Sequence, residues 1–213
     1  AFDVKIYTSW YLIKSHFPIF IMKHLQQLEP GLNAYKVSFD ASLLNPLRTM
    51  FDTYLRERLG REGYAYLFAG MEQINIQLKL EELRFHVTSY GAAPLLWVSA
   101  NNADTYDIFT SYLTDLDIFD DIKELVDFDD HIEVYCGFFV VGKHMDRPTW
   151  HKDYRDGANG YTLITPLFDL DMSHGNLMYK NALSAVKTYD YKMAEAVIFG
   201  DGFEHATEPY PET

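Results

Sequence analysis

The sequence contains a pair of residues, His151 and Asp153, whose types and spacing suit the binding of a metal ion. Residues i and i+2 of a β-strand point to the same face, so both side chains could reach one ion. His205, far along the chain and just after a Gly-Asp-Gly turn, is placed to supply a third ligand from a remote strand. Two imidazoles and one carboxylate on one face of an octahedron leave three positions open, which suits non-haem Fe(II) and oxygen activation. These residues form a candidate iron site.

Two other features compete for the same chemistry. His144 and Asp146 form an earlier His-x-Asp pair, but Arg147-Pro148 follows it and proline disfavours a continuing central strand, so we interpret that pair as loop residues. His174, in the run DMSHG, is interpreted as a surface turn residue. The sequence contains no Gly-x-Ser-x-Gly elbow, phosphate-binding Gly-rich loop or His-Glu-x-x-His zinc motif.

The elements that must position the candidate ligands are short β-rich runs, which begin near residue 131. They are rich in β-branched and aromatic residues and are separated by Gly, Asn, Asp or Ser. Runs of this length at intervals of about ten residues favour an antiparallel sandwich or barrel. The predicted strands cover residues 132–141, 160–168, 176–179, 186–191 and 194–199.

The sequence before residue 130 shows helical periodicity instead. Apolar residues recur at spacings of three to five over 12–28, before a Pro-Gly stop signal. An Asn-Pro pair predicts the start of a second helix over 45–59, which a glycine ends. A third helix is predicted over 104–122, with apolar residues on one side and aspartates on the other.

Together these patterns predict an α+β fold in one domain that spans residues 1–213. A helix-rich support, about 1–130, would pack on the outer face of a β core, about 131–213. The helices would then help to shape the mouth of the barrel that holds the metal.

Several segments of the second half resemble the Fe(II)/2-oxoglutarate-dependent oxygenases, especially the phytanoyl-CoA-hydroxylase-like branch. The likeness covers roughly residues 132–209. It is carried by WHKD at 150–153, GYTLITPLFDLD at 160–171, HGNLMY at 174–179 and AVIFGDGFEHAT at 196–207.

The resemblance implies a double-stranded β-helix, that is, a jelly-roll or cupin-like barrel, with iron held by His151, Asp153 and His205. It also implies that 2-oxoglutarate chelates the metal and is decarboxylated to succinate. The reaction would hydroxylate, or otherwise oxidise, a C–H bond of a small molecule or a side chain.

The sequence departs from the family pattern after His205. The family places a basic residue, usually Arg, about ten positions later to pair with the distal carboxylate of 2-oxoglutarate, and here no Lys or Arg follows. We expect either that the given sequence ends before the last barrel strand or that Lys180 or Lys192 substitutes. Tyr161 and Thr165, on one face of a predicted strand, are further candidate contacts to the cosubstrate.

Composition narrows the range of partners. The chain has 18 Lys and Arg against 31 Asp and Glu, a net charge of -13, which opposes a broad nucleic-acid footprint. The most apolar stretch is too short and too interrupted for a membrane span. A single cysteine, Cys136, allows no internal disulfide and suits a reducing, intracellular compartment. We expect neither a nucleic-acid nor a membrane partner, and the oxygenase hypothesis implies a small-molecule substrate.

Two alternatives keep the same barrel. One is a non-catalytic cupin-like binding module, which the absent Arg favours. The other is a metal-dependent hydrolase or isomerase that uses the same three ligands with Zn or Mn. Iron-dependent turnover of 2-oxoglutarate to succinate would separate the oxygenase from both.

Overall fold

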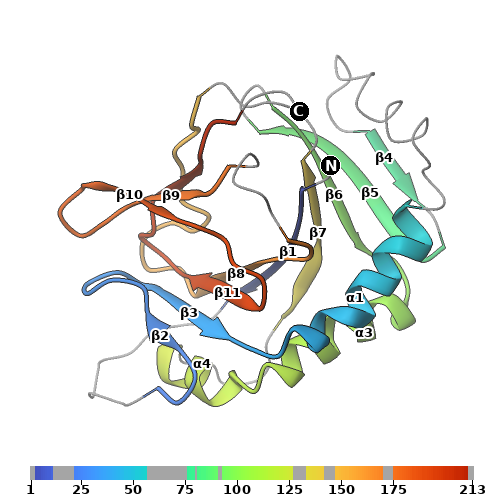
Figure 1. The fold of residues 1–213 in the computed structure, drawn as a ribbon, viewed down its shortest axis with the longest axis horizontal. Helices are drawn as coiled ribbons and strands as arrows, with labels where there is room; N and C mark the ends of the chain where they lie inside the picture. Colours follow the sequence, from blue (N-terminus) through green and yellow to red (C-terminus); the bar gives the residue numbers. More distant parts are fainter. Residues whose placement is uncertain are drawn as a thin grey trace.

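Alternating β-rich runs build two antiparallel sheets, and helices cover one of them, so the fold is α+β (Figure 1). The computed structural model describes residues 3–11, 22–56, 76–79, 81–90, 93–126, 133–141, 147–169 and 175–210. The larger sheet consists, in spatial order, of β2 (Gln26–Gln27), β3 (Ala34–Ser38), β11 (Glu195–Phe199), β8 (Gly160–Pro166), β1 (Asp3–Tyr11), β7 (Tyr135–Val141), β6 (Ala93–Ala100), β5 (Leu83–Tyr90) and β4 (Ile76–Lys79). The smaller sheet consists of β10 (Val186–Tyr189), β9 (Leu177–Lys180) and β12 (His205–Thr207).

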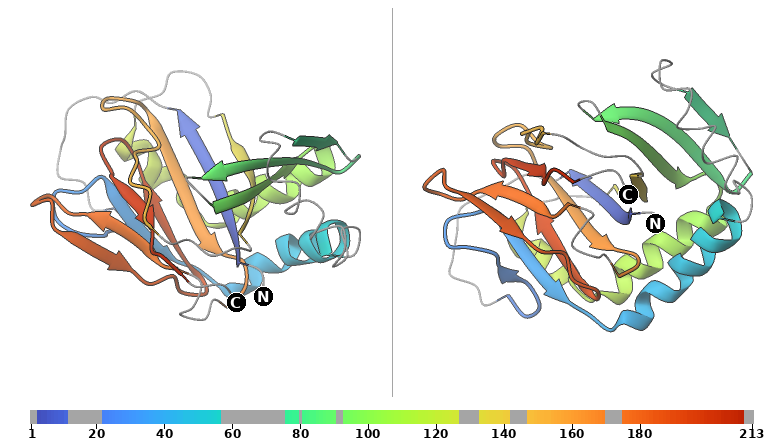
Figure 2. Two further views of the ribbon diagram at one scale, coloured as in Figure 1. Left: turned by 90° about the horizontal axis from the view of Figure 1, so that it is seen from above. Right: turned by 45° about the horizontal axis from the view of Figure 1, so that its top comes forward.

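The described helical elements lie together against one face of the larger sheet (Figure 2). They are the 3-10 helix η1 (Ala41–Leu44), α1 (Asn45–Met50), the π-helical turn η2 (Phe51–Arg56), α3 (Ala103–Asp115) and α4 (Phe119–Leu125). A side-chain cap begins α3, because Asn102 Oδ1 accepts the backbone N–H of Thr105 at 3.0 Å. No helix among the described residues is long and apolar enough to cross a membrane.

Two of the three predicted helices are present. The helix predicted over 45–59 is confirmed as far as Arg56, and residues 57–59 lie outside the described part. The helix predicted over 104–122 is present but divided into α3 and α4. The break falls at Asp117, whose φ of 53° is left-handed and cannot continue a right-handed helix.

The prediction of a helical first half is wrong. Its described residues contribute β1 to β6, and residues 22–28, the described part of the helix predicted over 12–28, form bends and β2. The strands carry a period-two signal that the prediction overlooked: Leu83 and Phe85 are buried in β5 while Arg84 between them is exposed. The predicted division into a helical support and a separate β core is therefore wrong as well.

The strands predicted in the second half are confirmed. Each of β7, β8, β10 and β11 lies within its predicted run, and β9 extends its run by a single residue, Lys180. The short strand β12, which begins at His205, was not predicted as a strand.

Two cores fill the space between the layers. Leu163 of β8 faces the helices and packs in one core with Phe109 of α3. Ile164, its neighbour in β8, faces the smaller sheet and packs in a second core with Tyr179 and Phe203. Burial of each such side chain contributes about 1.5–3 kcal/mol. The larger sheet is thus the central layer, and its second face looks toward the candidate ligands.

Candidate metal centre

The three predicted ligands lie together. One ligand atom from each of His151, Asp153 and His205 lies within 4.8 Å of the other two. The Nε2 atoms of His151 and His205 are 3.3 and 3.6 Å from Asp153 Oδ1. Two ligand atoms bound at about 2.1 Å and at right angles on one metal are about 3 Å apart, so these spacings are close to those of a coordinated ion. We call these three residues the His-Asp-His cluster.

Backbone pairing brings the two histidines together. His151 and His205 form an antiparallel bridge in which the N–H of each donates to the carbonyl of the other, at 3.0 and 2.9 Å. Directly paired residues project to the same face, and here the ring centroids are 4.1 Å apart. His205 is also paired with Tyr179 of β9, so the histidine pair extends the smaller sheet.

Backbone carbonyls orient both imidazoles. His151 Nδ1 is 3.1 Å from the carbonyl oxygen of Thr149, and His205 Nδ1 is 3.2 Å from that of Phe203. An imidazole protonated at Nδ1 donates to this carbonyl and leaves the Nε2 lone pair facing Asp153. This is the arrangement in which histidines bind metals.

A buried hydroxyl fixes the carboxylate. Thr162 of β8 donates to Asp153 Oδ2 at 2.7 Å, so Oδ1 is the oxygen that faces both Nε2 atoms. Thr162 has no exposed surface, and its oxygen is also 3.4 Å from the hydroxyl of Tyr154. The sequence analysis missed Thr162, although its type and its place in the strand after the ligand pair could have indicated it.

The distal histidine is held neutral by its surroundings. His205 is 5% exposed, and its ring centroid lies 4.6 Å from that of Phe199 and 5.5 Å from that of Phe203. Burial lowers the pKa of His205 to about 4; the Asp153 carboxylate opposes this shift and His151 adds to it. The imidazole is therefore unprotonated near pH 7, as metal binding requires.

Tyr161 and Thr165 do not reach the cluster. They share a face of β8, as expected, but Tyr161 packs in the core beneath the helices, whereas Thr162 faces Asp153. Both hydroxyls are engaged there: Tyr161 donates to Asn33 Oδ1 at 2.8 Å and Thr165 donates to the carbonyl of Glu195 at 3.0 Å. Tyr161 and Thr165 were predicted to contact the cosubstrate, but they lie on the opposite face of β8 from the cluster. A shift of one residue along the strand would have selected the correct face.

The side chain of Lys180 also lies on the face of its strand that is turned away from the His-Asp-His cluster. Its neighbour Tyr179 shares the face of His205, so Lys180 lies on the outer face of the smaller sheet. There its ammonium group pairs with Glu204 at 2.5 Å and lies 5.0 Å from the ring centroid of Trp150. The other candidate cation, Lys192, is an exposed residue after β10.

Three further residues named from the sequence fall outside the described part of the chain. They are His144 and Asp146, the competing pair, and His174. Their interpretation as loop and turn residues stays a prediction.

A hydrogen-bonded network joins the two loops that carry the ligands. Asp201, in the turn before the distal histidine, accepts the backbone N–H of Gly157 at 2.8 Å and the side-chain amide of Asn33 at 2.7 Å. Gly157 belongs to the loop that follows Asp153. Because Asn33 in turn accepts the Tyr161 hydroxyl, the network also anchors both loops to β8. The sequence analysis did not identify this network.

Comparison with models of known protein families gave no match, and comparisons with curated proteins and with solved structures gave none either. The functional assignment therefore rests on the chemistry of the cluster and on the architecture that carries it.

Proposed function

We propose that this protein is a non-haem Fe(II) oxygenase in which His151, Asp153 and His205 hold the iron and 2-oxoglutarate is the cosubstrate. The substrate would be a small molecule or a side chain with an oxidisable C–H bond. The observation that carries the proposal is the convergence of two Nε2 atoms on one carboxylate oxygen, from positions far apart in the chain.

The donor set fits the metal. Two neutral imidazoles and one carboxylate are the ligands of non-haem iron oxygenases, and Zn or Mn can also use them. When bound in such a set, Fe(II) supplies oxygen activation at its open positions. The chain supplies the geometry: the Thr149 and Phe203 carbonyls hold the imidazoles, and Thr162 holds the carboxylate.

The surroundings of the cluster also support the proposal. The rings of Phe199 and Phe203 lie against His205 and exclude water from that side. The cluster stands where the smaller sheet faces β8 of the larger one. Two facing antiparallel sheets with the ligands between them are consistent with the double-stranded β-helix that the sequence resemblance implies.

One observation favours a second candidate, a hydrolase or isomerase that uses the same ligands without 2-oxoglutarate. Tyr161, Thr165 and Lys180, the three residues predicted to contact the cosubstrate, all lie on faces turned away from the cluster. The metal site is common to both candidates, and the cosubstrate distinguishes them.

The test loads the full chain with Fe(II) without oxygen, removes unbound metal, and measures iron content and then succinate formed from 2-oxoglutarate in air. We expect one iron per chain and iron-dependent succinate formation. His151→Ala and Asp153→Ala should each lose the iron with the fold retained by circular dichroism. His144→Ala, in the competing pair, should keep it.

Iron retained at one equivalent in His151→Ala would overturn the metal assignment. Iron bound in the wild type with no binding of 2-oxoglutarate, measured by calorimetry under nitrogen, would refute the oxygenase and support the second candidate.

A further inference from the structure

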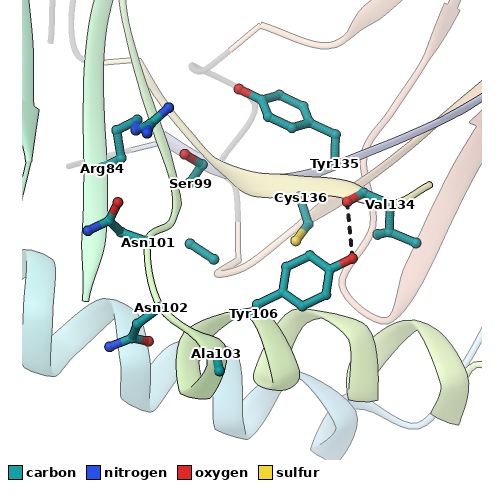
Figure 3. A pocket seen from close by; sticks show the side chains of 10 residues that line it. Arg84, Ser99, Asn101, Asn102, Ala103, Tyr106, Val134, Tyr135 and Cys136 are labelled. Atoms are coloured by element: carbon teal, nitrogen blue, oxygen red, sulfur yellow. Dashed lines mark hydrogen bonds between the residues drawn. The ribbon is translucent and has the colours of Figure 1, made fainter. Parts of the chain in front are cut away.

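A separate cavity of about 450 Å³ lies where β6 ends, β7 begins and α3 starts (Figure 3). Its wall comes from these three elements and from Arg84 of β5. None of its lining residues belongs to the His-Asp-His cluster. The volume is within the range of small-molecule sites.

Two polar side chains that can recognise an anion, those of Ser99 and Arg84, line the cavity. Ser99 is only 7% exposed as a residue and lines the cavity, but its hydroxyl is not among the buried side-chain atoms that lack a hydrogen-bond partner in the described part of the chain. Arg84, its directly paired neighbour, is exposed and makes no ion pair with any described residue.

The start of α3 lies beside these two side chains. Ala103, the first residue of the helix, lines the cavity, and Asn102 just before it is the capping residue. The N-terminal end of a helix favours negative charge. The guanidinium group of Arg84 and the hydroxyl of Ser99 therefore border one space, beside a helix start whose first turn already holds the carboxylate of Asp104.

An aromatic surface borders the same space. Tyr135 is 55% exposed and stacks on Trp97, with ring centroids 5.2 Å apart and an interplanar angle of 21°. Its hydroxyl accepts the Trp97 indole N–H at 2.8 Å, so its own proton remains available for donation. Tyr106, on the helix side, is 41% exposed and donates to the carbonyl of Val134 at 3.4 Å (Figure 3).

We propose that this cavity binds a small organic anion with a flat apolar body. Its carboxylate or phosphate oxygens would pair with the guanidinium of Arg84 and accept the hydroxyl of Ser99, and its body would lie against Tyr135. Arg is suited to planar, bidentate recognition of such oxygens. The proposal does not depend on the metal site or on the proposed function.

The test titrates the full chain with benzoate, phenyl phosphate and the uncharged analogue benzyl alcohol, and follows binding by saturation-transfer NMR. We expect at least one of the anions to bind and benzyl alcohol to bind at least about tenfold more weakly. Comparison of benzoate with phenyl phosphate shows which anionic group the site prefers. Arg84→Gln, at an exposed position, should weaken the anion about tenfold or more, because a charge-assisted hydrogen bond is worth about 1.5–3 kcal/mol.

Two matched variants complete the design. Ser99→Ala should also weaken the anion, whereas Lys187→Gln, which removes an exposed cation from β10 in the smaller sheet, should leave its affinity unchanged. Failure of both anions to bind, or equal affinity in Arg84→Gln and the wild type, would overturn the proposal. Binding that persists in Arg84→Gln but is lost in Asp153→Asn would assign the anion to the cluster instead and would also overturn it.

Discussion

The carboxylate of Asp153 divides its two oxygens between two partners. Oδ2 accepts the hydroxyl of Thr162, and Oδ1 faces the imidazoles of His151 and His205. A ligand held in this way loses little conformational freedom when a metal binds, because its orientation is already set. The buried hydroxyl is therefore part of the proposed metal site, as the group that orients the Asp153 ligand.

Replacement of Thr162 by valine tests this role. Thr162→Val keeps the shape of the side chain and removes the hydrogen bond to Asp153, so we expect metal affinity to fall about 10- to 100-fold. Thr165→Val is the matched control, because Thr165 is equally buried on the other face of β8 and donates to the carbonyl of Glu195. Metal titration and urea unfolding should show that both variants lose stability and that only the first loses affinity. Equal affinities would show that the Thr162 hydroxyl has no part in the metal site.

Burial of His205 predicts a pH-dependent stability in the absence of metal. The pKa of His205 is lowered by burial to about 4, from an ordinary value of 6.5. Between these two pH values the unfolded chain binds a proton that the folded chain excludes, so the free energy of unfolding falls as the pH falls. The loss amounts to roughly 3 kcal/mol across the whole interval and is absent above it.

This dependence is measured by urea unfolding at pH 7 and pH 5 with a chelator present. His205→Gln, which cannot titrate, should lose less stability than the wild type over that interval. The same loss in both proteins would show that His205 does not carry the effect.

At the scale of elements, loops complete what the strands begin. The His151–His205 bridge fixes the backbones of the two histidines, but Asp153 lies in the loop that leads to β8. Asp201 connects that loop, through Gly157, to the turn that precedes β12. Asp201 thus adds to the histidine bridge and to the Thr162 hydrogen bond a third connection that sets the spacing of the ligands.

Removal of this connection should affect the metal more than the fold. Asp201→Ala loses the hydrogen bonds to Gly157 and Asn33, each worth about 0.5–1.5 kcal/mol, and lets the two ligand loops move apart. We expect metal affinity to fall several-fold in a chain that stays folded. Asp156→Ala is the control, because Asp156 is exposed in the same loop and pairs only with Lys152 among the described residues. Unchanged affinity in Asp201→Ala would refute the positioning role.

The alternation of side chains between the two faces of a strand explains which site predictions from the sequence succeeded and which failed. A short His-x-Asp pair and a remote histidine predicted the cluster, because the ligand types and the following β-run are local signals. The faces of β8 and β9 were assigned without knowledge of their neighbours, and the residues chosen there, Thr165 and Lys180, point away from the cluster. A shift of one residue is invisible in a strand such as β8, where every residue is buried.

At the scale of the whole molecule, the helix predicted to begin at Asn45 was found because its early proline and its apolar periodicity are recorded in adjacent residues. The predicted capping role of Asn45 is wrong, because Leu44 occupies the cap position and makes no side-chain cap. The larger sheet was not predicted, because its order depends on pairings between distant segments. Its strand β1 pairs with both β7 and β8, which come much later in the sequence. Local periodicity carries no information about such partners, so the order of the sheet was beyond reach, although the alternation of buried and exposed residues in β5 could have indicated a strand in the first half.

β1 lies in the middle of the larger sheet, and this position limits when the sheet can form during synthesis of the chain (Figure 1). On the ribosome β1 emerges before both of its partners, β7 and β8, and β11, on the other side of β8, comes later still. A chain that is still being synthesised therefore lacks the wall behind Asp153 and lacks His205 itself. The proposed metal site can therefore assemble only after nearly all of this sequence, through His205, has left the ribosome.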